Sequence, residues 1–429
     1  MLSGREGHPQ YDMGDISALP LPPVAQEISN TIERLALRGW SLKRTLDTIE
    51  ETSHAFALPA ALRSCLGDYN PLAIEAELVR IQAEIDAIAF DLYGFSDADR
   101  DAVQCNQSAV NDGDADISAD DGDEGDDEDD TSPIDQTIGL LSWAVGVAFG
   151  RFDWRLATGE RAAPAEPEPF DPLPVKSPGM LPDGAAPFHP HAGILVDDQG
   201  HPHDLARLVE EVLARVEAPV PEDVRRWLQK DFFPFHLQRY SKSRRKAPIY
   251  WPLATTSGSY TLWVYYPNLT SQTLYTAIND FIEPKLKQVG ADVTTLRNKG
   301  SARTRDDEKQ FEALQAFELE LIELRDTLLG LAPNYKPNHD DGVQITAAPL
   351  WPLFRHKPWQ KVLKDTWAKL QKGDYDWAHL AMNYWPERVR EKCKTDKSLA
   401  IAHGLEDLYI EPEAKPKKVR GKKKAGGDE

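Results

Sequence analysis

A block of acidic residues divides this chain and limits what it can fold into. Residues 97–130 contain 15 Asp and Glu residues against a single Arg, with almost no apolar side chains. Such a segment buries too little apolar surface to offset the conformational entropy lost when its backbone is ordered. We therefore expect a disordered acidic linker at residues 97–133, and folded regions on both sides of it.

The formal net charge of −21 does not exclude a nucleic-acid partner, because the acidic block carries most of it. Residues 225–250 hold eight Lys and Arg residues against one acid, Asp231. Charge acts locally, so a basic region can attract a polyanion although the whole chain is acidic. DNA therefore stays among the possible partners.

Several classes of protein are excluded by simpler features. The sequence has no run of 18 uncharged apolar residues, which predicts no membrane span. Its first residues lack a basic segment followed by an apolar one, so we expect no signal peptide and a cytoplasmic location. Cys65, Cys105 and Cys393 are far apart and odd in number, which predicts neither a disulfide framework nor a metal-binding Cys pair.

Long helices are predicted on both sides of the acidic block. In residues 71–93, apolar side chains recur at steps of four and three, the spacing of a helix that packs along a partner helix. Asn70 and Pro71 should begin this helix and Gly94 should end it. A second pair, from Thr273 to about Val289 and through the leucines of residues 314–331, predicts an antiparallel helical hairpin.

Short strands complete the predicted fold. β-branched and aromatic residues flank residues 256–259, which indicates a β hairpin. The predicted fold is mainly α with a smaller mixed α/β part, in which long, coiled-coil-like helical hairpins act as spacers beside a short β hairpin or sheet. The expected regions are a helical part at 1–96, the acidic linker at 97–133, a helical and Pro-rich connecting region at 134–224, a basic, aromatic α+β domain at 225–410, and a disordered basic tail at 411–429.

The strongest functional signal is a stretch that combines basic and aromatic residues. Its predicted phosphate contacts are Lys242, Arg244, Arg245 and Lys246, and the rings of Tyr250 and Trp251 could stack on bases beside them. Aromatic residues at alternating strand positions are equally typical of a core, so this alternative stays open.

A second basic stretch contains Arg355, His356, Lys357, Lys361 and Lys364. We expect Arg355 and Lys357 to be a second set of DNA contacts. Trp359 and Trp367 in the same stretch lie eight residues apart and can share a helix face, which favours a role in the core.

No catalytic site is predicted. The histidines His189, His191, His201 and His203 have the residue type of a transition-metal site, but their spacing matches a turn followed by a helix cap at Asp204 better. The sequence has no nucleophile elbow, no phosphate-binding P-loop, and neither the catalytic tetrapeptide nor the glycine-rich cofactor loop of an adenine methyltransferase. Whether the chain is an enzyme stays open.

Two parts of the sequence resemble known families. EIDAIAFDLYGFSDADRDAV, residues 84–103, resembles the end of target-recognition domains in type IIG restriction-methylation enzymes and type I specificity subunits. Residues 241–289, 341–380 and 385–409 resemble the C-terminal region of PglX-type adenine-specific DNA methyltransferases, which belong to BREX phage-defence systems. Residues 51–60 and 139–161 fit the same region.

The resemblance implies site-specific binding of double-stranded DNA, with adenine methylation performed by a catalytic domain that this sequence lacks. It implies that residues 1–96 are the helical end of a target-recognition region. It also implies no cofactor on this chain, with S-adenosylmethionine on a separate subunit, and as partners an adenine methyltransferase catalytic subunit or other phage-defence proteins. The alternatives are a protein-interaction module without DNA readout and a truncated methyltransferase remnant.

Overall fold

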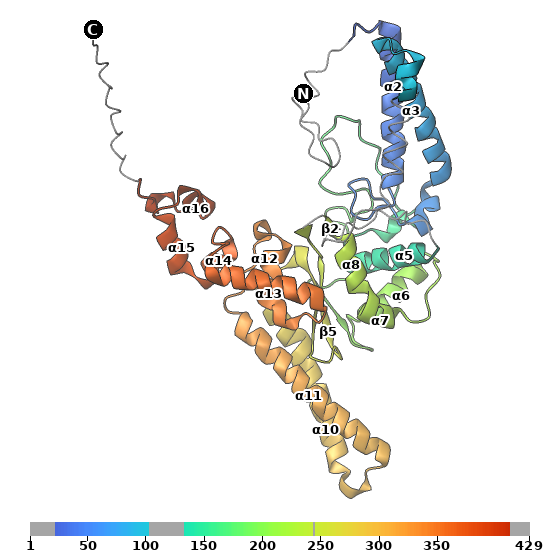
Figure 1. The fold of residues 1–429 in the computed structure, drawn as a ribbon. Coiled ribbons are helices and arrows are strands. Elements are labelled where there is room, and N and C mark those ends of the chain that lie inside the picture. Colours follow the sequence, from blue (N-terminus) through green and yellow to red (C-terminus); the bar gives the residue numbers. More distant parts are fainter. Residues whose placement is uncertain (1–21, 103–132, 243–244, 412–429) are drawn as a thin grey trace, which may run out of the picture. The chain divides into compact units, whose positions relative to one another are not determined.

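The computed structural model describes residues 22–102, 133–242 and 245–411, and the chain divides into two units (Figure 1). Unit 1 comprises residues 1–143 and 152–184, and unit 2 comprises residues 144–151 and 185–429. Most of the predicted acidic linker and almost all of the predicted basic tail lie outside the described residues. The predicted boundaries at 133 and 224 do not coincide with this division, because the Pro-rich segment belongs to unit 1 and the strand and helix after it belong to unit 2.

Two long helices, α2 (Gln26–Asp47) and α3 (Pro71–Tyr93), pair in unit 1. Leu35 and Leu42 of α2 meet Ile81 of α3 at the centre of their contact. The α3 residues packed around this centre are Ile74, Leu78, Ile85 and Ile88, so the predicted apolar seam is confirmed. The predicted ends are confirmed too, since the Asn70 side chain caps the helix and Gly94 ends it with a left-handed φ of 67°.

The rest of unit 1 contains little regular structure. Its elements are the 3-10 helices η1 (Ala60–Leu66) and η2 (Trp154–Leu156), the first part of helix α5 (Pro133–Ala148) and a helical segment at residues 97–102. The prediction of disorder is therefore wrong for residues 97–102, where the Ser96 hydroxyl accepts from the Asp99 amide and starts a helical turn. The Ser142 hydroxyl on α5 donates a buried hydrogen bond of 2.7 Å to Glu51. The Pro-rich segment after η2 forms turns and irregular chain, as predicted from its prolines.

A three-stranded antiparallel sheet organises unit 2. Its strands are β1 (Ile194–Asp197), β4 (Tyr250–Ala254) and β5 (Thr261–Tyr265), in the order β1-β5-β4. β4 and β5 form the predicted hairpin, whose turn contains Gly258 with a φ of 78°. Pro252 lies opposite Trp263 and Ala254 lies opposite Thr261, so these four side chains share one face of the sheet.

Helices precede and follow the sheet strands. Before the β4–β5 hairpin lie α6 (Leu205–Arg215), α7 (Val224–Trp227), the π-helical segment η3 (Leu228–Phe232), α8 (Phe233–Arg239) and the short strands β2 (Ser241–Lys242) and β3 (Arg245–Lys246). After it lie η4 (Tyr266–Asn268), α9 (Thr273–Thr276), the π-helical η5 (Ala277–Ile282), α10 (Glu283–Asn298), η6 (Gly300–Ala302) and α11 (Arg305–Leu331).

α10 and α11 lie side by side and confirm the predicted helical hairpin (Figure 1). The first helix runs to Asn298 and does not end near Val289, so the connection is shorter than predicted. Thr304 and Asp307 form a capping box in which each side chain bonds the other's backbone, and this fixes the start of α11.

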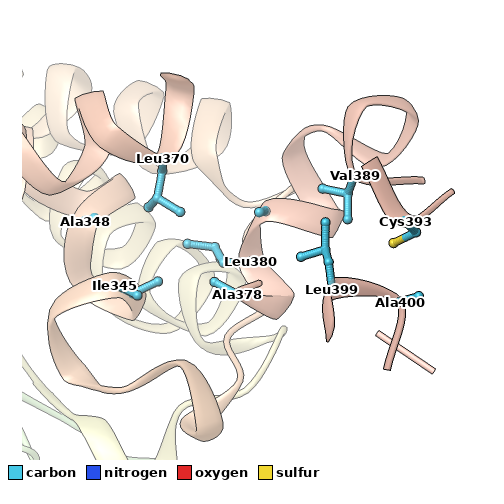
Figure 2. Packing of buried hydrophobic residues seen from close by; sticks show 10 residues of the cluster. Ile345, Ala348, Leu370, Ala378, Leu380, Val389, Cys393, Leu399 and Ala400 are labelled. Atoms are coloured by element: carbon cyan, nitrogen blue, oxygen red, sulfur yellow. The ribbon is translucent and has the colours of Figure 1, made fainter. Parts of the chain in front are cut away.

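The last part of the chain that the structure describes is a cluster of short helices around α13 (Lys357–Lys372). The others are η7 (His339–Asp341), α12 (Val343–Ala347), η8 (Ala348–Leu353), α14 (His379–Tyr384), α15 (Pro386–Cys393), α16 (Lys397–Ala402) and η9 (Glu406–Leu408). Figure 2 shows their buried side chains, with Leu370 of α13 beside Leu380 of α14 and Val389 of α15 near Leu399 of α16. The C-terminal part of the apolar side of α13, with Leu370 and Trp367, thus belongs to the core of this cluster.

The predicted fold class is confirmed, because helices dominate and the strands form only a three-stranded and a two-stranded antiparallel sheet in the described parts of the chain. Among the same residues, none of the helices combines the length and the apolar character needed to cross a membrane.

Candidate nucleic-acid interface

The first predicted contact set lies on the two-stranded β2–β3 hairpin of unit 2. Lys242 on β2 pairs with Arg245 on β3, and both side chains are exposed. Lys246 is half-buried, and Arg244 lies outside the described residues. We call Lys242, Arg245 and Lys246 the basic hairpin.

Tyr250 and Trp251 do not belong to this surface. Both side chains are 0% exposed, and they lie on β4 in the core of unit 2. The Tyr250 ring stacks on Phe149 at 5.0 Å and on Tyr265 at 5.3 Å, and the Trp251 indole donates a hydrogen bond to the Pro248 carbonyl. Buried rings offer no face to a base, so the prediction that these two residues contact DNA is wrong, and the core alternative holds for both.

The Arg355 side chain is half-buried and binds the backbone of unit 2. Its guanidinium donates to the backbone carbonyls of Thr255 at 2.7 Å, Ala254 at 2.6 Å and Pro352 at 3.2 Å. Burial lowers its pKa, which the charges of Glu323 and Glu320 partly oppose. These bonds join the end of β4 to the end of η8, so the Arg355 guanidinium is already occupied by backbone carbonyls. Lys357 is the exposed residue of the second predicted set.

Lysines cover the exposed side of α13. Lys357, Lys361, Lys364 and Lys372 project within about 80° of one another, since each helical residue turns by roughly 100°. Trp359, Leu363, Thr366 and Leu370 are buried on the opposite side, which confirms the predicted core role of Trp359. We call these four lysines together with Lys369 the α13 lysine face. Within the described part of the chain none of the five forms an ion pair, although the Lys364 ammonium lies 5.2 Å from the centre of the Trp351 ring and the exposed Asp365 projects between Lys372 and Lys369.

The basic hairpin and the start of α13 lie near each other. His356 is the residue before α13, burial lowers its pKa, and the charge of nearby Lys246 lowers it further. No side chain caps α13, so its first amide groups and its positive dipole end add to the charge of Lys357. Lys246 therefore brings positive charge near the first turn of α13 within unit 2.

The sequence interpretation missed Lys369 and Lys372. The sequence does contain a pattern that could have found them: a helical period of 3.6 places every lysine of residues 357–372 away from the Trp359 side.

The histidines form a hydrogen-bonded turn. His189 Nε2 lies 2.8 Å from His203 Nδ1, while His191 accepts from the Gly193 amide and His201 accepts from the His203 amide. Over the described residues, no group of three His, Cys, Asp or Glu side chains could hold a metal ion. Asp204 precedes α6 as predicted, but its carboxylate bonds Arg225 and does not cap the helix.

A comparison of the chain with models of known protein families gives no match, and neither does a comparison with characterised proteins.

Proposed function

We propose that this chain binds double-stranded DNA as the specificity and scaffold part of a site-specific adenine methyltransferase system in phage defence. The observation that carries the proposal is the α13 lysine face, whose five lysines form no ion pair among the described residues and whose first turn follows His356, near Lys246 of the basic hairpin. Lysines neutralise phosphates and release counterions, which supplies most of the affinity of non-specific DNA binding.

The dimensions of this face suit a duplex. Lys357 and Lys372 are fifteen residues apart, which corresponds to about 22 Å along the helix axis. A DNA strand advances by about 3.4 Å per phosphate, so the face can follow several consecutive phosphates. These contacts position a protein on DNA, and base readout needs further side chains.

The resemblance supplies the rest of the proposal. In this proposal a separate subunit carries S-adenosylmethionine and transfers the methyl group, this chain carries no cofactor, and both work in the cytoplasm. The paired helices α10 and α11 would serve as a spacer, since the exposed side of α11 carries more acids than bases and α10 exposes both signs, so neither forms a basic surface for phosphates.

The test is the affinity for a labelled 20-base-pair duplex, measured by fluorescence anisotropy at several salt concentrations. In the variant K357E/K361E/K364E/K372E, we expect at least tenfold weaker binding and a salt slope reduced by about 0.9 for each lost phosphate contact. The matched control, K287E/R297E/R305E/K309E, makes the same change of net charge on exposed positions of α10 and α11. Equal affinities of the two variants would contradict the proposal.

A second candidate is a protein-interaction module of a defence complex without direct DNA readout. Exposed apolar side chains at the C-terminal helices favour it: Trp377 is 47%, Ile401 is 55% and Ile410 is 68% exposed. Duplex binding without salt dependence would favour this candidate, whereas co-purification of a methyltransferase would agree with either function.

A further inference from the structure

Helix α3 of unit 1 carries a second apolar stripe on the side that faces away from α2. Its members recur at steps of three and four residues and project within about 80° of one another: Leu72, Ala76, Val79, Ala83, Ala87 and Phe90. The α3 residues that pack against α2, centred on Ile81, lie on the opposite side of the helix. We call the six residues the outer α3 stripe.

The outer α3 stripe is exposed in the part of the chain that the structure describes. Leu72 is 76% and Val79 is 71% exposed, and the three alanines are exposed as well. Phe90, at the end of the stripe, is half-buried, and its ring lies 5.6 Å from that of the exposed Phe95. Leu72 and Phe90 are separated by about 27 Å along the helix, so the exposed apolar side chains form a continuous stripe and are not scattered singly.

The spacing of the stripe is that of a side which packs against another helix. Steps of three and four place apolar residues along one side of a helix, and the side of α3 that packs on α2 has the same steps. A helix with apolar residues on two opposite sides is typical of the interior of a helical bundle. Because α2 covers only one of these sides, the outer α3 stripe fits one further helix.

The charges beside the stripe indicate which kind of helix fits. Glu75 and Asp86 lie along one edge of it, and neither forms an ion pair with a described residue. Along the other edge, Arg80 already pairs with Glu84 at 3.3 Å and with Glu77 at 3.9 Å. The edges are therefore acidic, and a helix with lysines or arginines beside its apolar residues would neutralise them.

A second copy of α3 fits the stripe less well. In a parallel pair, Asp86 would face Asp86 of the copy, and in an antiparallel pair the two edges that carry Glu75 and Asp86 would face each other. Like charges at such positions destabilise a pair of helices. A nucleic acid is disfavoured for the same reason, because its phosphates would approach unpaired carboxylates.

We propose that the outer α3 stripe binds a basic amphipathic helix of another protein. The apolar residues of that helix would lie against Leu72, Val79 and Phe90, and the alanines between them let the two helices approach closely. Its basic residues would pair with Glu75 and Asp86. This inference does not depend on the proposed DNA-binding function, because all residues assigned to DNA lie in unit 2.

Binding of a synthetic helix to the full chain tests the proposal. The probe is a fluorescently labelled peptide of three heptads, with Leu at the two core positions and Lys at the flanking positions, and anisotropy measures its affinity. Two control peptides accompany it: one carries Glu in place of Lys, and the other has the composition of the Lys peptide in scrambled order. We expect the Lys peptide to bind at least tenfold more tightly than either control and less tightly as the salt concentration rises.

The variants locate the binding site. V79D places a charge at the centre of the stripe and should weaken binding of the Lys peptide at least tenfold. L319D is the matched control, because Leu319 on α11 is also exposed and the substitution changes the net charge equally. E75Q/D86N keeps the apolar residues and should reduce the preference for the Lys peptide over the Glu peptide. This variant keeps the test valid if V79D unfolds, which circular dichroism would show.

The proposal is overturned if the scrambled peptide binds as tightly as the Lys peptide, because net charge then explains the binding. It is also overturned if the Lys peptide does not bind, or if V79D and L319D bind it equally. Sedimentation of the chain alone tests the second copy. A dimer that V79D dissociates and L319D preserves would assign the stripe to that copy and overturn the proposal as well.

Discussion

Helices α11 and α13 of unit 2 bury their apolar residues by the same rule and expose opposite charges. Leu321, Leu324 and Leu328 of α11 are buried at steps of three and four, and Leu363 and Leu370 of α13 are buried in the same manner. The exposed side of α11 carries acids such as Glu312 and Glu323, whereas that of α13 carries lysines. Apolar spacing therefore decides how a helix packs, and the residues between the apolar positions decide what it can bind.

The largest expected effect concerns the shared packing rule. L328A on α11 and L363A on α13 each remove a side chain that is 0% exposed, and each should lower the free energy of unfolding by about 2–5 kcal/mol. L319A makes the same truncation on the 67% exposed side of α11 and should change it by less than about 0.5 kcal/mol. Chemical denaturation measures all three. Equal losses at the three positions would show that burial does not distinguish the two sides of these helices.

A histidine of unit 2 makes the stability of this unit depend on pH, independently of the charged faces of α11 and α13. Burial lowers the pKa of His191 to about 4, so this histidine is neutral in the folded protein where the unfolded chain already takes up a proton. Its stabilising contribution is complete above about pH 6.5 and is lost as the pH falls toward 4, by up to about 1.4 kcal/mol per pH unit.

The variant H191N isolates this contribution. The Asn carbonyl can accept from the Gly193 amide as His191 Nδ1 does, but it does not titrate. Unfolding free energies of H191N measured from pH 7 to pH 4.5 should therefore fall less steeply than those of the wild type. H54N removes an exposed histidine of unit 1 and serves as the control, with an unchanged slope. An identical pH dependence of H191N and the wild type would refute the assignment.

The smallest expected effect tests whether the charges alone decide binding. Residues 312, 316, 319 and 323 of α11 are spaced by four, three and four, which matches the start of the α13 lysine face. The starting protein is the variant whose α13 lysines are changed to Glu. Adding the substitutions E312K/A316K/L319K/E323K to it should raise its duplex affinity about tenfold. Anisotropy titrations measure it, and an equal transplant of Gln should restore far less. No recovery would mean that the surroundings of α13 contribute to DNA binding.

Local periodicity explains what the sequence could predict. The α3 seam, the α10–α11 hairpin and the β4–β5 hairpin each follow from residues close together in the chain, and all three were confirmed. The end of α10 was misplaced, because Gly290 and the polar residues after it weaken the apolar pattern although the helix continues to Asn298.

The candidate sites were less predictable, since they depend on burial and on distant segments. Basic residues beside aromatic ones suggested one surface, but Tyr250 and Trp251 pack inside the sheet while Lys242 and Arg245 stay outside. No local pattern distinguishes a buried strand aromatic from an exposed one. The cavity of about 230 Å³ in unit 2 was invisible in the sequence, because its lining comes from residue 197, residues 228–234, residues 252–263 and residues 355–356.

The path of the chain between the two units has a consequence for the gene. The chain passes from one unit to the other after residues 143, 151 and 184, and the first of these positions lies inside α5. Splitting the gene at any single position would therefore leave at least one unit incomplete. A split after residue 143 would also divide helix α5. Recombination that exchanged one unit for a variant would have to replace two separate stretches at once, so the two units should be inherited together.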